Sequence, residues 1–195
     1  MLFLNCLAMA SNIQLKSIIT VDSSVEYDSS GKGIVFFDFD SWATNNAVRG
    51  CDCISKIDLI TTTLQQDIPT WFIEIKDFRY IHYKPNEKNI TGIGDTLEKK
   101  ILGTCKILSS PDCIPEVKSL QPDSGVTNFL FHYEMPLATN TSAYFPSGYP
   151  ITAIQYLKTN SNICSMFKNM YAANAKMMNA SDIYPWTIKL TDNRK

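Results

Sequence analysis

The sequence predicts a mixed α+β fold, with a central sheet of about five strands flanked by helices. Segments rich in β-branched and aromatic residues dominate the first half of the chain, and apolar residues at helical spacing become common after residue 95. No repeat, low-complexity block or linker divides the 195 residues. We therefore expect one domain over residues 1–195, with an N-terminal β-hairpin and a C-terminal helical extension.

Composition excludes several classes of protein. Apolar residues make up 45% and charged residues 19% of the chain, which is typical of globular proteins and not of disordered ones. The net charge is −1, so any contact with nucleic acid has to rest on a local basic patch. No apolar run approaches the roughly 20 residues of a membrane-spanning helix, and the six cysteines form no CxxC pair of the structural-zinc type. We expect a cytoplasmic protein with free thiols and no membrane partner.

The first half of the chain predicts two antiparallel strand pairs. The β-rich segments 13–21 and 33–39 surround a polar stretch with a turn signal at 28–31, which predicts the hairpin. The run 48–60 and the strand-like segment 71–75 are separated by a short polar loop, so we expect these two to pair as well.

The second half predicts helices around one more strand. Apolar residues at helical spacing predict a helix over 95–108, with Gly94 or Asp95 as its N-cap. Residues 126–133 are β-branched and aromatic and predict a strand. From residue 151 onward the spacing predicts two helices, the last of which ends before Pro185.

The segment 71–79 contains the residues that point to chemistry. On a strand, Glu74 and Lys76 share one face while Ile73 and Ile75 take the other. Asp58 lies between aliphatic residues in the run expected to pair with this strand, so a hairpin would bring it against Glu74. Two converging carboxylates are the hard oxygen ligands that Mg²⁺ prefers, and a neighbouring lysine can orient a water or stabilise a developing phosphate charge.

Two alternatives stay open for these residues. Asp52 competes with Asp58 for the ligand role, because both even-numbered positions would face the same way on an unbroken strand. The aliphatic flanks of Asp58 and its shorter loop favour Asp58. The other alternative has no chemistry: Glu74 forms a half-exposed ion pair with Lys76 or Arg79 on a one-sided sheet.

The layout resembles the PD-(D/E)XK nuclease superfamily, in which an Asp on one strand is followed by E-x-K on the next, a helix and a further strand. The resemblance runs from about residue 34 to 134 and is carried by the sequences IDLI at 57–60, WFIEIKDFR at 71–79 and DTL at 95–97, with PWTI at 185–188 beyond them. It looks closest to small uncharacterised bacterial members. The resemblance implies a restriction-endonuclease-like fold, with Asp58 and Glu74 as ligands of Mg²⁺ or Mn²⁺ and Lys76 as the catalytic lysine.

The function predicted on this basis is metal-dependent hydrolysis of phosphodiester bonds in nucleic acid, with DNA as the expected substrate of an endonuclease. A catalytically inactive relative that binds nucleic acid or a protein is the alternative, and the oligomeric state, including a homodimer, stays open. Basic residues flank the expected site and are candidates for contacts to the phosphate backbone: Lys56, Arg79, Lys84, Lys88, Lys99, Lys100 and Lys106. The histidines, His82 and His132, are expected to be surface or packed strand residues.

Overall fold

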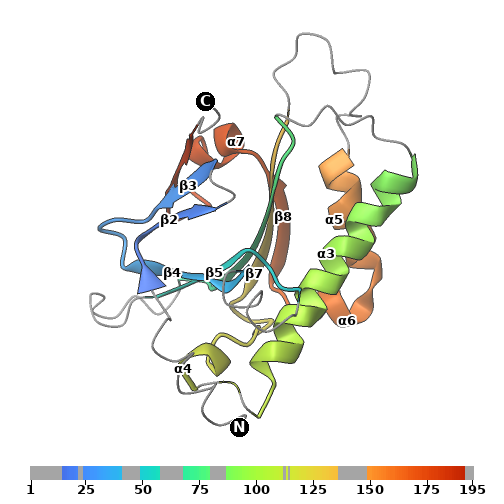
Figure 1. Cartoon of the computed structure of the whole chain (residues 1–195), viewed down its shortest axis with the longest axis horizontal. Coiled ribbons are helices and arrows are strands. Elements are labelled where there is room, and N and C mark those ends of the chain that lie inside the picture. Colours follow the sequence, from blue (N-terminus) through green and yellow to red (C-terminus); the bar gives the residue numbers. More distant parts are fainter. Residues whose placement is uncertain are drawn as a thin grey trace, which may run out of the picture.

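A six-stranded mixed sheet and a three-stranded antiparallel sheet organise the fold (Figure 1). The computed structural model describes residues 15–21, 24–40, 49–57, 68–79, 87–111, 113, 115–135 and 149–191. Asp58, His82 and Lys84 lie outside the described residues, and the side chain of Lys88 is also undescribed.

The large sheet is mixed, with three antiparallel and two parallel pairs of neighbouring strands. Its strands, in spatial order, are β1 (Leu15–Lys16), β4 (Ile34–Asp38), β5 (Cys53–Ile57), β6 (Trp71–Asp77), β7 (Asn128–Glu134) and β8 (Asn169–Ala173). The neighbouring pairs from β1 to β6 are antiparallel, whereas β7 runs parallel to both β6 and β8. Parallel neighbours need crossover connections, and helices lie on both: α3 (Glu87–Leu108) and α4 (Pro115–Lys118) between β6 and β7, then α5 (Tyr149–Thr159) and α6 (Ser161–Cys164) between β7 and β8.

The small sheet brings the two ends of the described chain together. Its strands are β2 (Ile18–Val21), β3 (Val25–Asp28) and β9 (Thr187–Leu190), with β3 in the middle. The short helix α7 (Ala175–Asn179) connects the large sheet back to β9, and the Asn179 side-chain amide donates to the Ile188 carbonyl and accepts from its N–H. A segment near the start of the chain is therefore held by one near its end.

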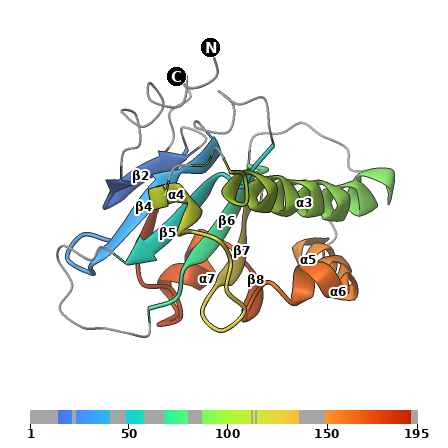
Figure 2. The ribbon, with the colours of Figure 1, turned by 90° about the horizontal axis from the view of Figure 1, so that it is seen from below.

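The large sheet is covered on both faces. Helices α3, α5 and α6 lie on one side, and β2, β3 and α7 lie on the other (Figure 1). In the perpendicular view α3 runs beside the ends of the central strands (Figure 2). Each face has its own apolar cluster: Phe72, Leu97, Ile101 and Phe129 belong to the helical side, and Tyr27, Trp71, Ile73 and Trp186 belong to the side of the small sheet. A strand buried on both faces accounts for the nearly continuous apolar run in β6.

The expected pairing of segment 13–21 with segment 33–39 is confirmed only at Leu15–Lys16, because β2 (Ile18–Val21) pairs with β3 in the small sheet instead. Leu15 lies opposite Phe37 and pairs β1 with β4. The polar stretch between them, however, contains the strand β3, whose Tyr27 is fully buried. The turn at 28–31 does form: the Ser30 N–H donates to Asp28 Oδ1 at 2.8 Å, and Gly31 has a φ of +74°.

The helix predicted over 95–108 ends as expected and begins earlier, at Glu87. Gly94, expected as an N-cap, lies inside α3, where a Cβ atom would overlap the ring of Tyr156 on α5. The hydroxyl of Tyr156 donates to Asp95 Oδ1 at 2.5 Å. The glycine is explained by the close approach of two helices, and not by the end of one.

The C-terminal region is not the helical extension that was expected. Helices α5, α6 and α7 do form, but β8 and β9 lie between and after them. Met170, which fitted a helical spacing, lies in β8 and packs into the helical-side cluster, while Ile188 lies in β9 and packs into the other. Their apolar side chains are covered by segments distant in sequence, which is information that local spacing does not contain.

Two further expectations concern the cysteines and the membrane. The described cysteines are free thiols, as expected, and Cys51 and Cys53 are buried. They do not share a face: Cys51 packs on the helical side and Cys53 on the other, because the chain bends at Asp52. Among the described residues, no helix combines the length and the apolar character required to span a membrane.

Candidate functional site

Strand β6 presents Glu74 and Lys76 on the same face, as the sequence predicted. Ile73 and Ile75 pack between the two sheets, so the alternate positions point toward the helices. The side chain of Glu74 is 0% exposed, and that of Lys76 is 33% exposed at the outer end of the strand. Lys76 Nζ lies 2.8 Å from Glu74 Oε1. A surface ion pair is therefore the wrong description of Glu74, because its carboxylate is inside the protein.

Asp52 is the carboxylate that the structure brings to Glu74. In the β5–β6 pairing, Cys53 lies opposite Ile73, so the residue before Cys53 comes beside the residue after Ile73. Asp52 Oδ2 accepts the N–H of Ile75 at 2.5 Å, and the Asp52 carbonyl accepts the N–H of Phe39 at 3.1 Å. Backbone groups from two neighbouring strands thus hold this residue in place.

Lys100, on helix α3, joins the two carboxylates. Its Nζ lies 2.7 Å from Glu74 Oε1 and 3.0 Å from Asp52 Oδ1, and its side chain is 15% exposed. The helix is fixed at this height by Thr104, one turn further on, whose Oγ1 accepts the Cys51 N–H at 2.8 Å and donates to the Lys100 carbonyl at 2.9 Å. Asp52, Glu74, Lys76 and Lys100 form the candidate site.

Burial is the largest influence on the pKa of Glu74 in the candidate site. It raises the pKa of Glu74 to about 7, and the negative charge of Asp52 acts in the same direction, while Lys76 and Lys100 oppose it. Burial alone would lower the pKa of Lys100, but the charges of Glu74 and Asp52 outweigh it, so the pKa of Lys100 is raised. Above neutral pH the site therefore contains two carboxylates and two ammonium groups.

The donor set suits a divalent cation of the magnesium type. Mg²⁺ is commonly bound through one or two carboxylates, with waters and substrate phosphates completing its shell. Asp52 and Glu74 already converge on one positive group, and Glu74 Oε2 is buried without a hydrogen-bond partner. Within the described part of the chain, no group of three or more His, Cys, Asp or Glu residues is arranged to hold a metal. A divalent cation at this place would therefore be held by two carboxylates, with solvent completing its shell.

Asp40 lies at the rim of the candidate site. It follows β4, is exposed, and donates its N–H to the Asp52 carbonyl at 3.1 Å. Partial burial and the charge of Asp52 raise the pKa of Asp40, while Lys100 and Lys76 oppose that shift. Its electrostatic contact with three site residues places a further carboxylate within range of the candidate site.

Asp58, expected as the partner of Glu74, lies outside the described residues, so its predicted convergence with Glu74 stays a prediction. Asp52 was the weighed alternative, and it is the one found beside Glu74. The signal that separates the two is the strand register, because an antiparallel pairing assigns one partner to each residue. The aliphatic flanks that favoured Asp58 carry no information about register.

The role of Lys100 differs from the sequence expectation. It was grouped with the basic residues as a contact for the phosphate backbone, whereas its ammonium is engaged with Glu74 and Asp52. Its neighbour Lys99 is exposed, as is Lys106 two turns further along the same face of α3, and both stay candidates for such contacts. The guanidinium of Arg79 forms an ion pair with Asp77 at 2.8 Å and donates a hydrogen bond to the Ser24 carbonyl at 3.3 Å. These contacts connect the end of β6 to the start of β3 in the small sheet.

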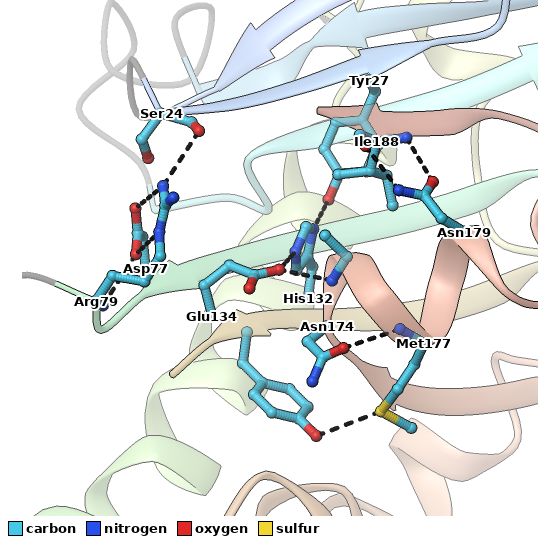
Figure 3. A network of polar contacts seen from close by, with 12 residues as sticks. Ser24, Tyr27, Asp77, Arg79, His132, Glu134, Asn174, Met177, Asn179 and Ile188 are labelled. Carbon is cyan, nitrogen blue, oxygen red and sulfur yellow. Dashed lines mark hydrogen bonds and ion pairs between the residues drawn. The ribbon is translucent and has the colours of Figure 1, made fainter. Parts of the chain in front are cut away.

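A second polar network lies on the other face of the large sheet (Figure 3). His132 on β7 is hydrogen-bonded through Nδ1 to the hydroxyl of Tyr27 and through Nε2 to Glu134 Oε1, at 2.6 Å for the second contact. Glu134 Oε1 also accepts the N–H of Ala175 at 2.6 Å. Tyr27 and His132 are fully buried, and burial raises the pKa of the Tyr27 hydroxyl well above its usual range. The network joins both sheets and α7 and is closed to solvent, so His132 is the packed strand residue that was expected.

Comparisons with known proteins add no information about the candidate site. The chain matches no model of a protein family, and the searches of curated proteins and of solved structures found no match.

Proposed function

We propose that this chain is a metal-dependent nuclease of the PD-(D/E)XK type that hydrolyses phosphodiester bonds, with DNA as its substrate class. The observation that carries the proposal is the convergence of Asp52, Glu74 and Lys76 on one face of adjacent strands. A buried glutamate with an unpaired oxygen is costly for a fold, and a cation-binding role accounts for it.

The order of the elements supports a restriction-endonuclease-like topology. The superfamily layout is an Asp on one strand, E-x-K on the next, a helix and a further strand. Here Asp52 directly precedes β5, Glu74 and Lys76 lie on β6, α3 follows, and β7 runs parallel to β6. Asp52 takes the place in this layout that the sequence assigned to Asp58.

Each site residue has a role that follows from its position. Asp52 and Glu74 are the candidate ligands for Mg²⁺ or Mn²⁺. A bound divalent ion would supply Lewis-acid polarisation of a phosphoryl oxygen and acidify a water. Lys76 is the more exposed of the two lysines, so its ammonium can reach a substrate phosphate. There it orients the attacking water or offsets the charge that develops on the phosphate in the transition state.

One observation favours an inactive relative as the second candidate function. Two ammonium groups neutralise the two carboxylates, an arrangement that is self-contained without any added cation. Such a protein would bind nucleic acid or a protein partner through the same surface and cleave nothing.

A cleavage assay on a mixed panel of DNA and RNA, with Mg²⁺, with Mn²⁺ and with chelator, tests the proposal. Asp52→Asn and Glu74→Gln should abolish metal-dependent cleavage. Lys76→Ala should lower the single-turnover rate by a factor on the order of 100 while leaving nucleic-acid affinity within a few-fold. Lys189→Ala, which removes an exposed lysine from β9, is the matched control and should cleave at the wild-type rate.

The same assay separates the two aspartates and the two candidate functions. Loss of cleavage in Asp58→Asn but not in Asp52→Asn would return the ligand role to Asp58. Binding without cleavage under every metal condition would favour the inactive relative. A Lys76→Ala variant that cleaves at the wild-type rate would remove the lysine from the chemical step.

A further inference from the structure

Helix α3 contributes a positive charge at the point where a divalent cation would be held. Lys100 Nζ contacts both candidate ligands, at 2.7 Å from Glu74 Oε1 and 3.0 Å from Asp52 Oδ1. Among the described residues Lys76, by contrast, forms its ion pair with Glu74 alone, and it extends from the outer end of β6. The two lysines therefore occupy different positions: Lys100 bridges the two carboxylates, and Lys76 lies beside them.

The charges of the site are balanced before any cation arrives. Above neutral pH the charges of Asp52, Glu74, Lys76 and Lys100 sum to zero, with the exposed Asp40 as a further carboxylate at the rim. The side chains of Glu74 and Asp52 are 0% and 6% exposed. Adding a divalent ion would leave two uncompensated positive charges with little water to screen them. Favourable binding thus requires either that one ammonium withdraws or that negative charge enters with the ion.

We propose that Lys100 is an internal counter-cation that competes with the divalent ion for Asp52 and Glu74, so that the metal loads only as Lys100 withdraws from the carboxylates. The inference rests on the proposed metal site and adds its regulation. A lysine has a long flexible stem whose ammonium can move toward solvent while the stem stays packed. The phosphate backbone of a bound substrate supplies the anion that would receive the withdrawn ammonium.

Lys99 makes the proposal testable within one helix. It is the adjacent residue, has the same charge, and is exposed. Removing either ammonium changes the net charge of the protein equally, but only Lys100→Met vacates the space between the carboxylates. Calorimetric titration with Mn²⁺ alone at pH 8, without nucleic acid, should therefore give about tenfold or greater tightening for Lys100→Met and no change for Lys99→Met. The double variant Asp52→Asn with Lys100→Met should lose the gain.

The reactivity of the Lys100 amine in the wild type tests the same proposal if the Lys100→Met variant does not fold. Amine acylation followed by mass spectrometry should label Lys100 slowly in the metal-free protein, and several-fold faster when Mg²⁺ draws the carboxylates away from it. Lys99 is the internal reference and should be labelled at the same rate throughout.

The outcomes distinguish this inference from the proposed function. Equal or weaker Mn²⁺ binding by a folded Lys100→Met variant, or Lys100 labelling that does not respond to Mg²⁺, would overturn the competition even if the wild type cleaves DNA. If Lys100→Met binds Mn²⁺ more tightly but the wild type cleaves no nucleic acid, the competition between Lys100 and the metal would be supported and the proposed nuclease activity would be overturned.

Discussion

Replacing Glu74 with glutamine should change how the stability of the protein depends on pH. The pKa of Glu74 is raised from 4.5 to about 7, first by burial and then by the charge of Asp52. The folded protein therefore holds the Glu74 proton more tightly than the unfolded chain does. The stability that this proton contributes is fully present below about pH 4.5 and is lost as the pH rises through about 7.

The size of the effect follows from the shift. One pKa unit corresponds to about 1.4 kcal/mol, so the change from 4.5 to about 7 corresponds to about 3 kcal/mol of unfolding free energy. Glutamine conserves the shape of the side chain and does not titrate. Between pH 4.5 and 8, the wild type should lose about 3 kcal/mol relative to the Glu74→Gln variant.

Urea unfolding at a series of pH values measures this difference, with fluorescence of the buried tryptophans as the signal. Gly92→Ala is a suitable control, because it alters the helix and no ionisable group, so its profile should run parallel to that of the wild type. Parallel profiles for wild type and Glu74→Gln would refute the reasoning. A wild type that gains stability with rising pH relative to the variant would show that Lys76 and Lys100 outweigh the cost of burial.

Two further changes test the packing around the site. Tyr27→Phe should lower the unfolding free energy by about 1–3 kcal/mol in urea titration, because it leaves Nδ1 of the buried His132 without its partner; an unchanged midpoint would mean that His132 finds another partner. Gly50→Ala should lower the melting temperature, since a Cβ atom there would overlap the buried ring of Phe39 and overpacking costs about 1–3 kcal/mol. Gly92→Ala is again the counterpart, because it meets open space and should stabilise α3 by up to about 1 kcal/mol; a Gly50→Ala variant as stable as Gly92→Ala would contradict the crowding.

The local sequence pattern was sufficient to predict features that depend on a single strand or helix. The alternation of a strand put Glu74 and Lys76 on one face, and the structure confirms it. The antiparallel pairing of β5 with β6, the C-terminal end of α3 and the strand β7 also agree with the sequence prediction, because each is marked by its own composition. The strands β8 and β9 were missed, since their apolar residues are buried by distant segments.

Which residues make up the candidate site could be learned only from the tertiary structure. Strand register sets which aspartate faces Glu74, and a shift of a few residues along β5 leaves the sequence pattern unchanged while replacing the ligand. Lys100 enters the site because Thr104 fixes α3 against the residue before Asp52, and helical spacing alone does not reveal which sheet residues a helix face will meet. The sequence by itself determined that β6 carries a carboxylate, Glu74, and an amine, Lys76, on the same face. The partners of that strand were set by long-range packing, because electrostatic pairing depends on distance in space and not on distance along the chain.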